Sequence, residues 1–172
     1  METGAGCSTL AFLAATTGRV ITIVPDTELC DRIVVASTDY GIRLDGWTWL
    51  NNRSEIALPL LVSEHEQIDI ALIDGGHGWP TPFVDFCYLN QMMATGGTLI
   101  LDDLQLYSVG ELARLLVRQW EWDLVARAPS QKTVALRKTT DEPFLADFGG
   151  QPYIVERSAG QKIGYDHYGL DP

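Results

Sequence analysis

Short apolar runs alternate with longer helical patterns along most of this chain, and this alternation constrains the fold more than any other feature. The run IDIALI at residues 68–73 is almost wholly apolar, as expected for a central strand that is buried on both faces of a sheet. Strands that alternate with helices are typical of βαβ units around a parallel sheet. The pattern therefore predicts an α/β protein with a mainly parallel sheet.

The breaks between the runs place the strands. The sequence predicts strands at residues 20–24, 46–50, 68–73 and 98–101, the last one following Gly96 and Gly97. Two further strands are predicted at residues 122–128 and 133–137, separated by Pro129 and Ser130. Because so short a connection suits antiparallel neighbours, these two strands are expected to form a closing antiparallel pair.

Caps and prolines place the helices between the strands. Asp26 is a predicted N-cap for a helix to about Tyr40, and a short helix is expected to end near Leu61. Pro82 suits the first turn of a helix to about Met93. Ser108 and Glu111 have capping-box spacing, which predicts a helix from Ser108 to about Trp120.

The two ends of the chain depart from this regular pattern. Residues 2–6 look like the end of a first strand and its turn, yet almost no strand precedes them. We therefore expect the first strand to be truncated or missing, or the chain to be a fragment. Residues 1–139 are expected to form the α/β domain, and residues 140–172 an irregular tail that packs on the domain, forms a lid or reaches a partner chain.

Composition excludes several classes of partner. The chain has 172 residues and a formal net charge of −11, which argues against binding to nucleic acid phosphate or to an anionic membrane surface. Its 3 cysteines are scattered and form no CxxC pair, so neither a disulfide scaffold nor a zinc site is expected. No secretory signal or membrane span is apparent, and a cytoplasmic location is expected.

The first motif that can carry chemistry is ETGAGCSTL at residues 2–10. Gly4 and Gly6 permit a tight turn and a close backbone approach to a ligand. Ser8 and Thr9 can offer hydroxyls at the start of a helix, where amide donors also point outward. Glu2 can either fix the loop or meet the amino group of a ligand. A purely structural turn is the alternative interpretation.

The second and third motifs follow two buried strands. Asp74 and His77 lie in IDGGHG, directly after the strand at 68–73, and Asp102 and Asp103 follow the strand at 98–101. Ligands of open α/β sheets bind at such strand ends. Carboxylates that converge there would suit Mg²⁺ or a similar divalent cation. In the alternative interpretation these acids cap turns or are solvated, and His77 is a surface residue.

The three motifs together resemble those of the class I S-adenosylmethionine-dependent methyltransferases. ETGAGCSTL resembles their first motif, and IDGGHG followed by a helix and ATGGTLILDDL resembles their fourth and fifth strands. The resemblance covers residues 2 to about 137 and implies a Rossmann-like three-layer sandwich. The most similar branch is that of the metal-assisted sugar O-methyltransferases.

The resemblance also implies roles for single residues in binding S-adenosylmethionine. The residues implied to line the methionine part of the cofactor are Glu2, Gly4, Gly6 and Ser8. Val24 holds the place where the family has an acid for the ribose hydroxyls, so Asp26 is the expected substitute. Ser54 is expected near the adenine, and Asp74 is expected to touch the cofactor.

The implied chemistry is methyl transfer to a small-molecule acceptor, with a hydroxyl oxygen as the expected acceptor atom. Asp74, Asp102 and Asp103 match the metal carboxylates of the family. Gly76 stands where the related sugar enzymes have a second acid, so His77 is expected to act as the base together with Asp74. His77 suits this role because the unperturbed pKa of histidine lies near neutral pH.

Two other classes of function also fit parts of the pattern. A dinucleotide-binding oxidoreductase has a similar fold, but Val24 and the incomplete glycine motif speak against it. A non-catalytic or truncated methyltransferase-like domain, kept as a structural or interaction module, fits the short first strand and the missing ribose acid. Exchange of the tail, or pairing at an open sheet edge, would make the chain a homodimer.

Overall fold

The structure is a computed structural model that describes residues 1–141, 151 and 155. Helices and strands alternate through the first two thirds of the chain, as the sequence predicts. The elements in chain order are β1 (Glu2–Thr3), α1 (Cys7–Ala15), β2 (Val20–Ile23), α2 (Thr27–Asp39), β3 (Trp47–Leu50), α3 (Ser54–Ser63), β4 (Ile68–Ile73), α4 (Thr81–Met92), β5 (Met93–Leu101), α5 (Tyr107–Leu116), β6 (Trp122–Arg127) and β7 (Val134–Lys138).

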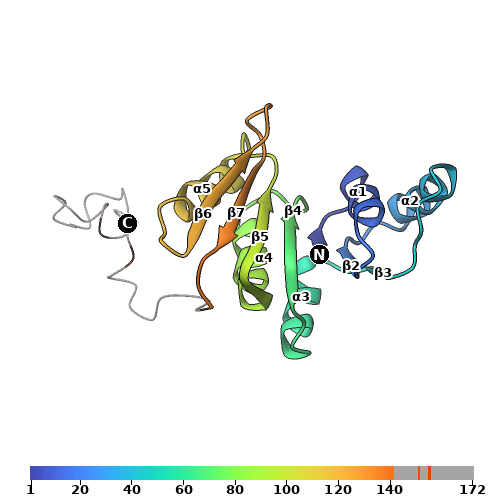
Figure 1. The fold of residues 1–172 in the computed structure, drawn as a ribbon, viewed down its shortest axis with the longest axis horizontal. Helices are drawn as coiled ribbons and strands as arrows, with labels where there is room; N and C mark the ends of the chain where they lie inside the picture. Colours follow the sequence, from blue (N-terminus) through green and yellow to red (C-terminus); the bar gives the residue numbers. More distant parts are fainter. Residues whose placement is uncertain (142–150, 152–154, 156–172) are drawn as a thin grey trace, which may run out of the picture.

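All of these strands belong to one sheet with the order β3-β2-β1-β4-β5-β7-β6. The first five strands in this order are parallel, and β7 is antiparallel to both β5 and β6. Strands β2 and β3 follow β1 on one side of it, and β4 and β5 follow on the other side (Figure 1). The direction in which successive strands are added therefore reverses between β1 and β4. Such a switch point opens a crevice at the carboxyl ends of the strands.

The helices lie in two layers on the sheet. The connections from β1 to β3 and those from β3 to β5 cross the sheet in opposite directions. Because such crossovers are right-handed, the helices of the first set, α1 and α2, lie on the opposite face from those of the second set, α3 and α4. Accordingly, α1 contacts α2, whereas α4 contacts both α3 and α5. The main apolar core includes Leu58, Leu89, Leu99 and Leu112, all fully buried or nearly so. The predicted three-layer α/β sandwich is therefore confirmed.

The first strand is present but very short. β1 has two residues and lies in the middle of the sheet, where Glu2 pairs with Thr22 on β2 and with Leu72 on β4. Figure 1 shows the amino terminus at this central position. The amide of Leu72 donates to the carbonyl of Met1 at 3.0 Å. The first strand of the described residues is therefore short and central, with two residues that pair on both sides.

The predicted start of β5 is wrong. The strand was expected to begin at residue 98, after Gly96 and Gly97, but α4 ends at Met92 and β5 already begins at Met93. The register between β4 and β5 shifts between Ile68 and Ile70. Gly96, at φ +85°, occupies this irregular stretch. The glycines therefore mark a bulge inside the strand, which is a second common role for glycine in a sheet.

The predicted cap of α5 is also wrong. The N-cap is Leu106 rather than Ser108, and the helix ends at Leu116, before the expected Trp120. The hydroxyl of Ser108 donates to the carbonyl of His77 instead of capping the helix. The Ser108 hydroxyl therefore bonds to a residue remote in sequence, whereas the local spacing predicted that it would cap the helix. The contact ties the start of α5 to the loop after β4.

Other predicted boundaries agree within a few residues. Asp26 caps α2 through a hydrogen bond that its side chain accepts from the amide of Leu29 at 2.8 Å, and Pro82 lies in the first turn of α4. Most of the predicted tail at residues 140–172 lies outside the described residues. Among the helices of the described part, none has the length and apolar character that crossing a membrane requires.

Candidate active site

The glycine turn after β1 lies directly against the end of β4. Gly4 adopts φ +96°, and a Cβ atom there would lie 2.3 Å from the carbonyl oxygen of Asp74. The amide of Asp74 donates to the carbonyl of Thr3 at 3.0 Å, and that of Gly4 donates to the carbonyl of Ile23 at 3.0 Å. Only glycine fits this position, because both the backbone angle and the space exclude a side chain.

A cavity of about 400 Å³ opens beside this contact, at the carboxyl ends of β1 to β4. Three residues that the sequence predicted to bind the cofactor line it, namely Gly4, Ser54 and Asp74. The remaining lining residues come from the same strand ends and the helices that follow: Thr3, Ala5, Ile23, Val24, Pro25, Leu29, Arg53, Glu55, Gly75, Gly76 and Thr81. The cavity therefore lies at the switch point of the sheet, where ligands of such folds bind.

Glu2 is not among the residues that line this cavity. Its side chain is fully buried and accepts hydrogen bonds from the hydroxyls of Ser8, Thr9 and Thr22, at 2.8, 2.5 and 2.9 Å. The indole of Trp47 donates in turn to the hydroxyl of Thr22 at 2.9 Å. Of the two roles that the sequence left open for Glu2, the structure supports the first, in which the carboxylate fixes the loop.

Gly6, Ser8 and Asp26 also lie outside the cavity lining. Gly6 is the N-cap of α1, and its amide donates to the hydroxyl of Thr9 at 3.0 Å. Ser8 is engaged with Glu2, and Asp26 caps α2. The structure thus gives each of these predicted cofactor residues a contact within the protein, and it brings Gly4, Ser54 and Asp74 to the cavity.

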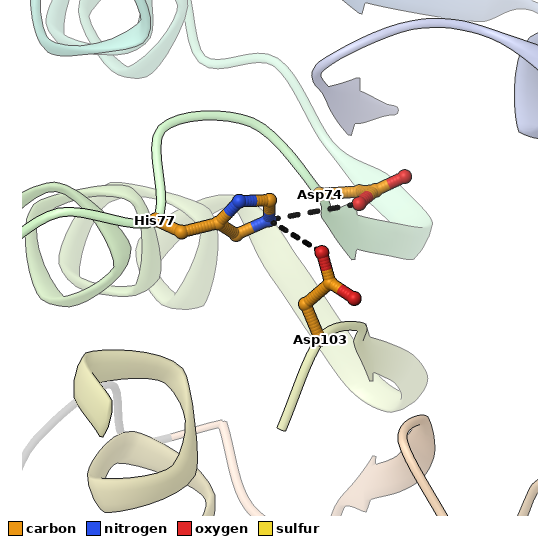
Figure 2. A group of neighbouring side chains, drawn as sticks. All are labelled: Asp74, His77 and Asp103. Carbon is orange, nitrogen blue, oxygen red and sulfur yellow. Dashed lines mark ion pairs between the residues drawn. The ribbon is translucent and has the colours of Figure 1, made fainter. Parts of the chain in front are cut away.

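A second group of side chains lies at the ends of β4 and β5. The Nε2 atom of His77 is 3.7 Å from a carboxylate oxygen of Asp74 and 3.7 Å from one of Asp103. Figure 2 shows the imidazole pointing between the two carboxylates, which come from different strand ends. Asp74 belongs to both the group and the cavity lining, so the group borders the cavity.

The charges of this group are poorly compensated. Burial raises the pKa of Asp74, and the negative charges of Asp102 and Asp103 raise it further. His77 opposes this shift, but its Nε2 atom is buried and makes no hydrogen bond to a described residue. Two carboxylates and an imidazole with unused bonding capacity can accept a proton or a cation.

Donor atoms of Asp74, His77 and Asp103 all lie within 4.8 Å of one another, close enough to share one metal ion. The sequence predicted Asp102 as the third ligand, but its carboxylate accepts a hydrogen bond from the hydroxyl of Thr133 on the loop before β7. Asp103 adopts φ +61°, a conformation that Asp tolerates better than most residues. Among the described residues, His77 therefore takes the place that the sequence gave to Asp102.

Sequence reasoning missed one acid beneath the cavity. Asp85, on α4, is fully buried, and the hydroxyls of Thr3 and Ser54 are close enough to lower its pKa, although burial has the larger effect and raises it. Its position four residues after Thr81, which lines the cavity, places both residues on one face of α4. The four-residue spacing from Thr81 to Asp85 is the signal that the sequence offers for this acid. It becomes informative only when the face of α4 that meets the cavity is known.

The open sheet, its central glycine turn and the ligand-sized crevice at the switch point define a class of protein, the Rossmann-like class I methyltransferases. A family model described as "Methyltransferase domain" matches residues 1–104, which is more than half of the chain. The chain therefore belongs to this methyltransferase family. The comparison with curated proteins found no match.

Solved structures with the same fold include several methyltransferases. The O-methyltransferase TomG from Streptomyces achromogenes, in complex with SAM, matches with a TM-score of 0.65 and 14% identity over 81% of this chain and 72% of its own. An rRNA methylase from Streptococcus thermophilus matches with a TM-score of 0.57 and 17% identity over 81% of this chain and 87% of its own. The SAH-bound methyltransferase PaMTH1 from Podospora anserina matches with a TM-score of 0.60 and 14% identity over 81% of this chain and 70% of its own.

Proposed function

We propose that this chain binds S-adenosylmethionine in the cavity at the switch point and transfers its methyl group to a hydroxyl oxygen of a small molecule. The observation that carries the proposal is the contact between Gly4 and the backbone of Asp74. This contact joins the predicted cofactor turn to the group that contains His77. One crevice can therefore serve both the methyl donor and the acceptor.

The cavity suits the two halves of the proposed cofactor. The lining residues include the apolar side chains of Val24, Pro25 and Leu29, which would suit a purine ring. They also include Gly4 and Asp74, whose polar groups would suit the amino acid part. In this arrangement Ser54 lies by the adenine. Glu2, Gly6 and Ser8 support the turn from behind, because their polar groups are used within the protein.

The group of Asp74, His77 and Asp103 is proposed to take the proton of the acceptor hydroxyl. Asp74 lines the cavity, so its carboxylate would meet the acceptor hydroxyl, and the imidazole of His77 lies 3.7 Å from both Asp74 and Asp103, within reach of the proton. General base catalysis of this kind contributes about 10²–10⁴-fold in rate.

A divalent cation is a second candidate for the same group, because its donor atoms lie within 4.8 Å of one another. Asp74, His77 and Asp103 would hold it, and a bound cation would supply Lewis-acid activation of the acceptor hydroxyl. A set of two carboxylates and one imidazole suits Mn²⁺ or Zn²⁺ at least as well as Mg²⁺. His77 cannot then serve as the base, since its Nε2 atom would be a ligand.

The charge of the chain favours a small acceptor over a nucleic acid. The formal net charge of −11 repels a phosphate backbone, although one protein of similar fold is an rRNA methylase. Trp79 and Tyr107 are both strongly exposed. They stand in the loop after His77 and at the start of α5, the two segments that the bond from Ser108 to His77 ties together. Exposed rings on these two segments would suit a planar acceptor that bears a hydroxyl.

Substitution of His77 tests the proposed chemistry. The purified chain would be incubated with S-adenosylmethionine and a panel of phenols, catechols and monosaccharides, while formation of S-adenosylhomocysteine is measured. We expect the His77→Asn variant to lose about 10²–10⁴-fold in turnover. The matched control is His65→Asn, because His65 is exposed and lies far from the site in the turn after α3.

The same assay separates the two candidates for the acidic group. Turnover that survives exhaustive chelation supports a proton acceptor without metal, whereas turnover that is lost and returns with Mn²⁺, Zn²⁺ or Mg²⁺ supports the cation. Equal turnover in His77→Asn and wild type would contradict both.

A further inference from the structure

The strongest feature that the proposed chemistry leaves unused is the buried acid on α4. Asp85 is fully buried, and neither of its carboxylate oxygens makes a hydrogen bond of standard geometry to a described residue. The hydroxyl oxygen of Thr3, which is also buried, lacks such a partner as well. A buried carboxylate that is not fully satisfied is costly, so its presence directly behind a ligand cavity calls for a physical reason.

The surroundings of Asp85 place it behind the floor of the cavity. The hydroxyls of Ser54 and Thr3 are near enough to lower the pKa of its carboxyl group, against the larger opposite effect of burial. Both Ser54 and Thr3 line the cavity, and so does Thr81, one turn before Asp85 on α4. Asp85 itself does not line the cavity, whereas these hydroxyl-bearing residues do.

The direction in which a hydroxyl donates decides what it offers to a ligand. A carboxylate can only accept hydrogen bonds, so a serine hydroxyl that faces one points its hydrogen toward it. The lone pairs of Ser54 are then left for the cavity, and they can accept a hydrogen bond only from a donor. Val24, Pro25 and Leu29 line the same cavity as Ser54, and their apolar side chains suit the ring that would carry this donor.

We propose that Asp85 is a positioning residue of the cavity, which orients the Ser54 hydroxyl as an acceptor for the exocyclic amino group of a bound adenine. This inference rests on the proposed function, because it takes S-adenosylmethionine as the ligand. It explains why the acid lies in the second turn of α4, behind the start of α3, where Ser54 is the first helical residue. It also assigns a specificity role to a residue that never touches the cofactor.

The test compares two ligands that differ at one position of the purine. Calorimetric titration with S-adenosylhomocysteine and with S-inosylhomocysteine, in which an oxo group replaces the amino group, gives a ratio of dissociation constants. We expect the wild-type chain to prefer the adenine ligand by about tenfold or more, since a lost donor leaves the polar groups of the site unpaired. In Asp85→Ala and in Ser54→Ala the ratio is expected to fall to less than about threefold.

Two further variants sharpen the comparison. Asp85→Asn retains a neutral acceptor and is expected to restore part of the preference, which a merely structural role would not predict. Asp69→Asn is the matched control, because Asp69 is an exposed acid near the opposite end of β4 and is expected to keep the full ratio. The double variant with Asp85→Ala and Ser54→Ala is expected to behave like either single variant, since both changes remove the same proposed acceptor for the ligand.

The outcomes separate the inference from the proposed function. If the wild-type chain does not bind S-adenosylhomocysteine, the proposed function fails and the inference fails with it. If that ligand binds but the ratio is unchanged in Asp85→Ala or Ser54→Ala, the inference alone is overturned. Should Asp85→Ala not fold, Ser54→Ala decides, because it removes the same acceptor without altering the buried charge.

Discussion

Two acidic regions lie on either side of the contact between β1 and β4, and the protein treats them in opposite ways. On one side, buried Glu2 accepts hydrogen bonds from three hydroxyls on α1 and β2. On the other side, Asp74 and Asp103 face His77 at 3.7 Å without a hydrogen bond to it. The first acid is buried and satisfied, whereas the second group is half-buried and has bonding capacity left over.

The difference separates scaffold from chemistry. An acid whose oxygens are all used within the protein can fix a turn, but it has little left to offer a ligand. Acids that repel one another and keep unused bonding capacity are costly in the free protein, and such groups gather where a proton or an ion is handled. Glu2 therefore belongs to the frame of the cavity and Asp74 to its reactive end.

The largest effect is expected for Glu2→Ala. This change leaves three hydroxyls without their acceptor and opens the centre of the sheet, so the free energy of unfolding should fall by roughly 3–5 kcal/mol. Urea titration followed by circular dichroism measures it. Glu28→Ala is the matched control, because Glu28 is exposed on α2 and should change stability little. A loss below about 1 kcal/mol for Glu2→Ala would show that this carboxylate does not hold the turn in place.

The next effect concerns the contact between the two regions. Gly4→Ala combines an unfavourable backbone angle with a Cβ atom 2.3 Å from the Asp74 carbonyl oxygen, so a loss of roughly 2–4 kcal/mol is expected. Gly41→Ala is matched, since Gly41 has φ +64° but open space around its Cβ position. It should lose only about 1–2 kcal/mol. Equal losses of unfolding free energy in the two variants would mean that the close approach of the new Cβ atom to Asp74 does not destabilise the protein.

Asp103→Asn addresses the reactive side. Asn tolerates the left-handed conformation of Asp103 about as well as Asp does, so the backbone should be preserved while one charge beside His77 is removed. Turnover is expected to fall by about 10–100-fold, with the free energy of unfolding unchanged or slightly raised. Asp123→Asn, at an exposed position of β6, is the control. Loss of stability without loss of turnover would show that Asp103 has a structural role and takes no part in the reaction.

The smallest effect is a dependence of stability on pH. Burial raises the pKa of Asp85 above its ordinary value of 3.8. Protonation of Asp85 therefore contributes stability that is fully present below pH 3.8 and is lost as the pH rises through the raised pKa of the folded state. Asp85→Asn should remove this loss and be more stable than wild type at neutral pH by about 1 kcal/mol. A less stable Asp85→Asn variant would show that the charged carboxylate holds the fold together.

These effects also mark how far the sequence alone could go. Most strands and helices follow from local patterns, because runs such as residues 68–73 and caps such as Asp26 act over a few residues. The misassigned start of β5 at Gly96 and the misassigned cap at Ser108 are different. A bulge opposite β4 and a bond to the carbonyl of His77 decide them, and both partners are remote in sequence.

The candidate site shows the same limit. The sequence placed Asp74, His77 and Asp103 at neighbouring strand ends, because parallel strands bring their carboxyl ends to one edge. It could not tell Asp102 from Asp103, since only the structure reveals that Thr133 donates to Asp102. Likewise the role of Glu2 depended on the direction of the side chain, which the motif leaves open.

One titration tests the central claim most directly, namely that the crevice between the framed turn and the acidic group holds the methyl donor. S-adenosylhomocysteine would be titrated calorimetrically into the wild-type chain and into Gly4→Ala. We expect saturable binding of one molecule per wild-type chain and a large loss of affinity in the variant. No binding to the wild-type chain, or equal binding to both, would contradict it.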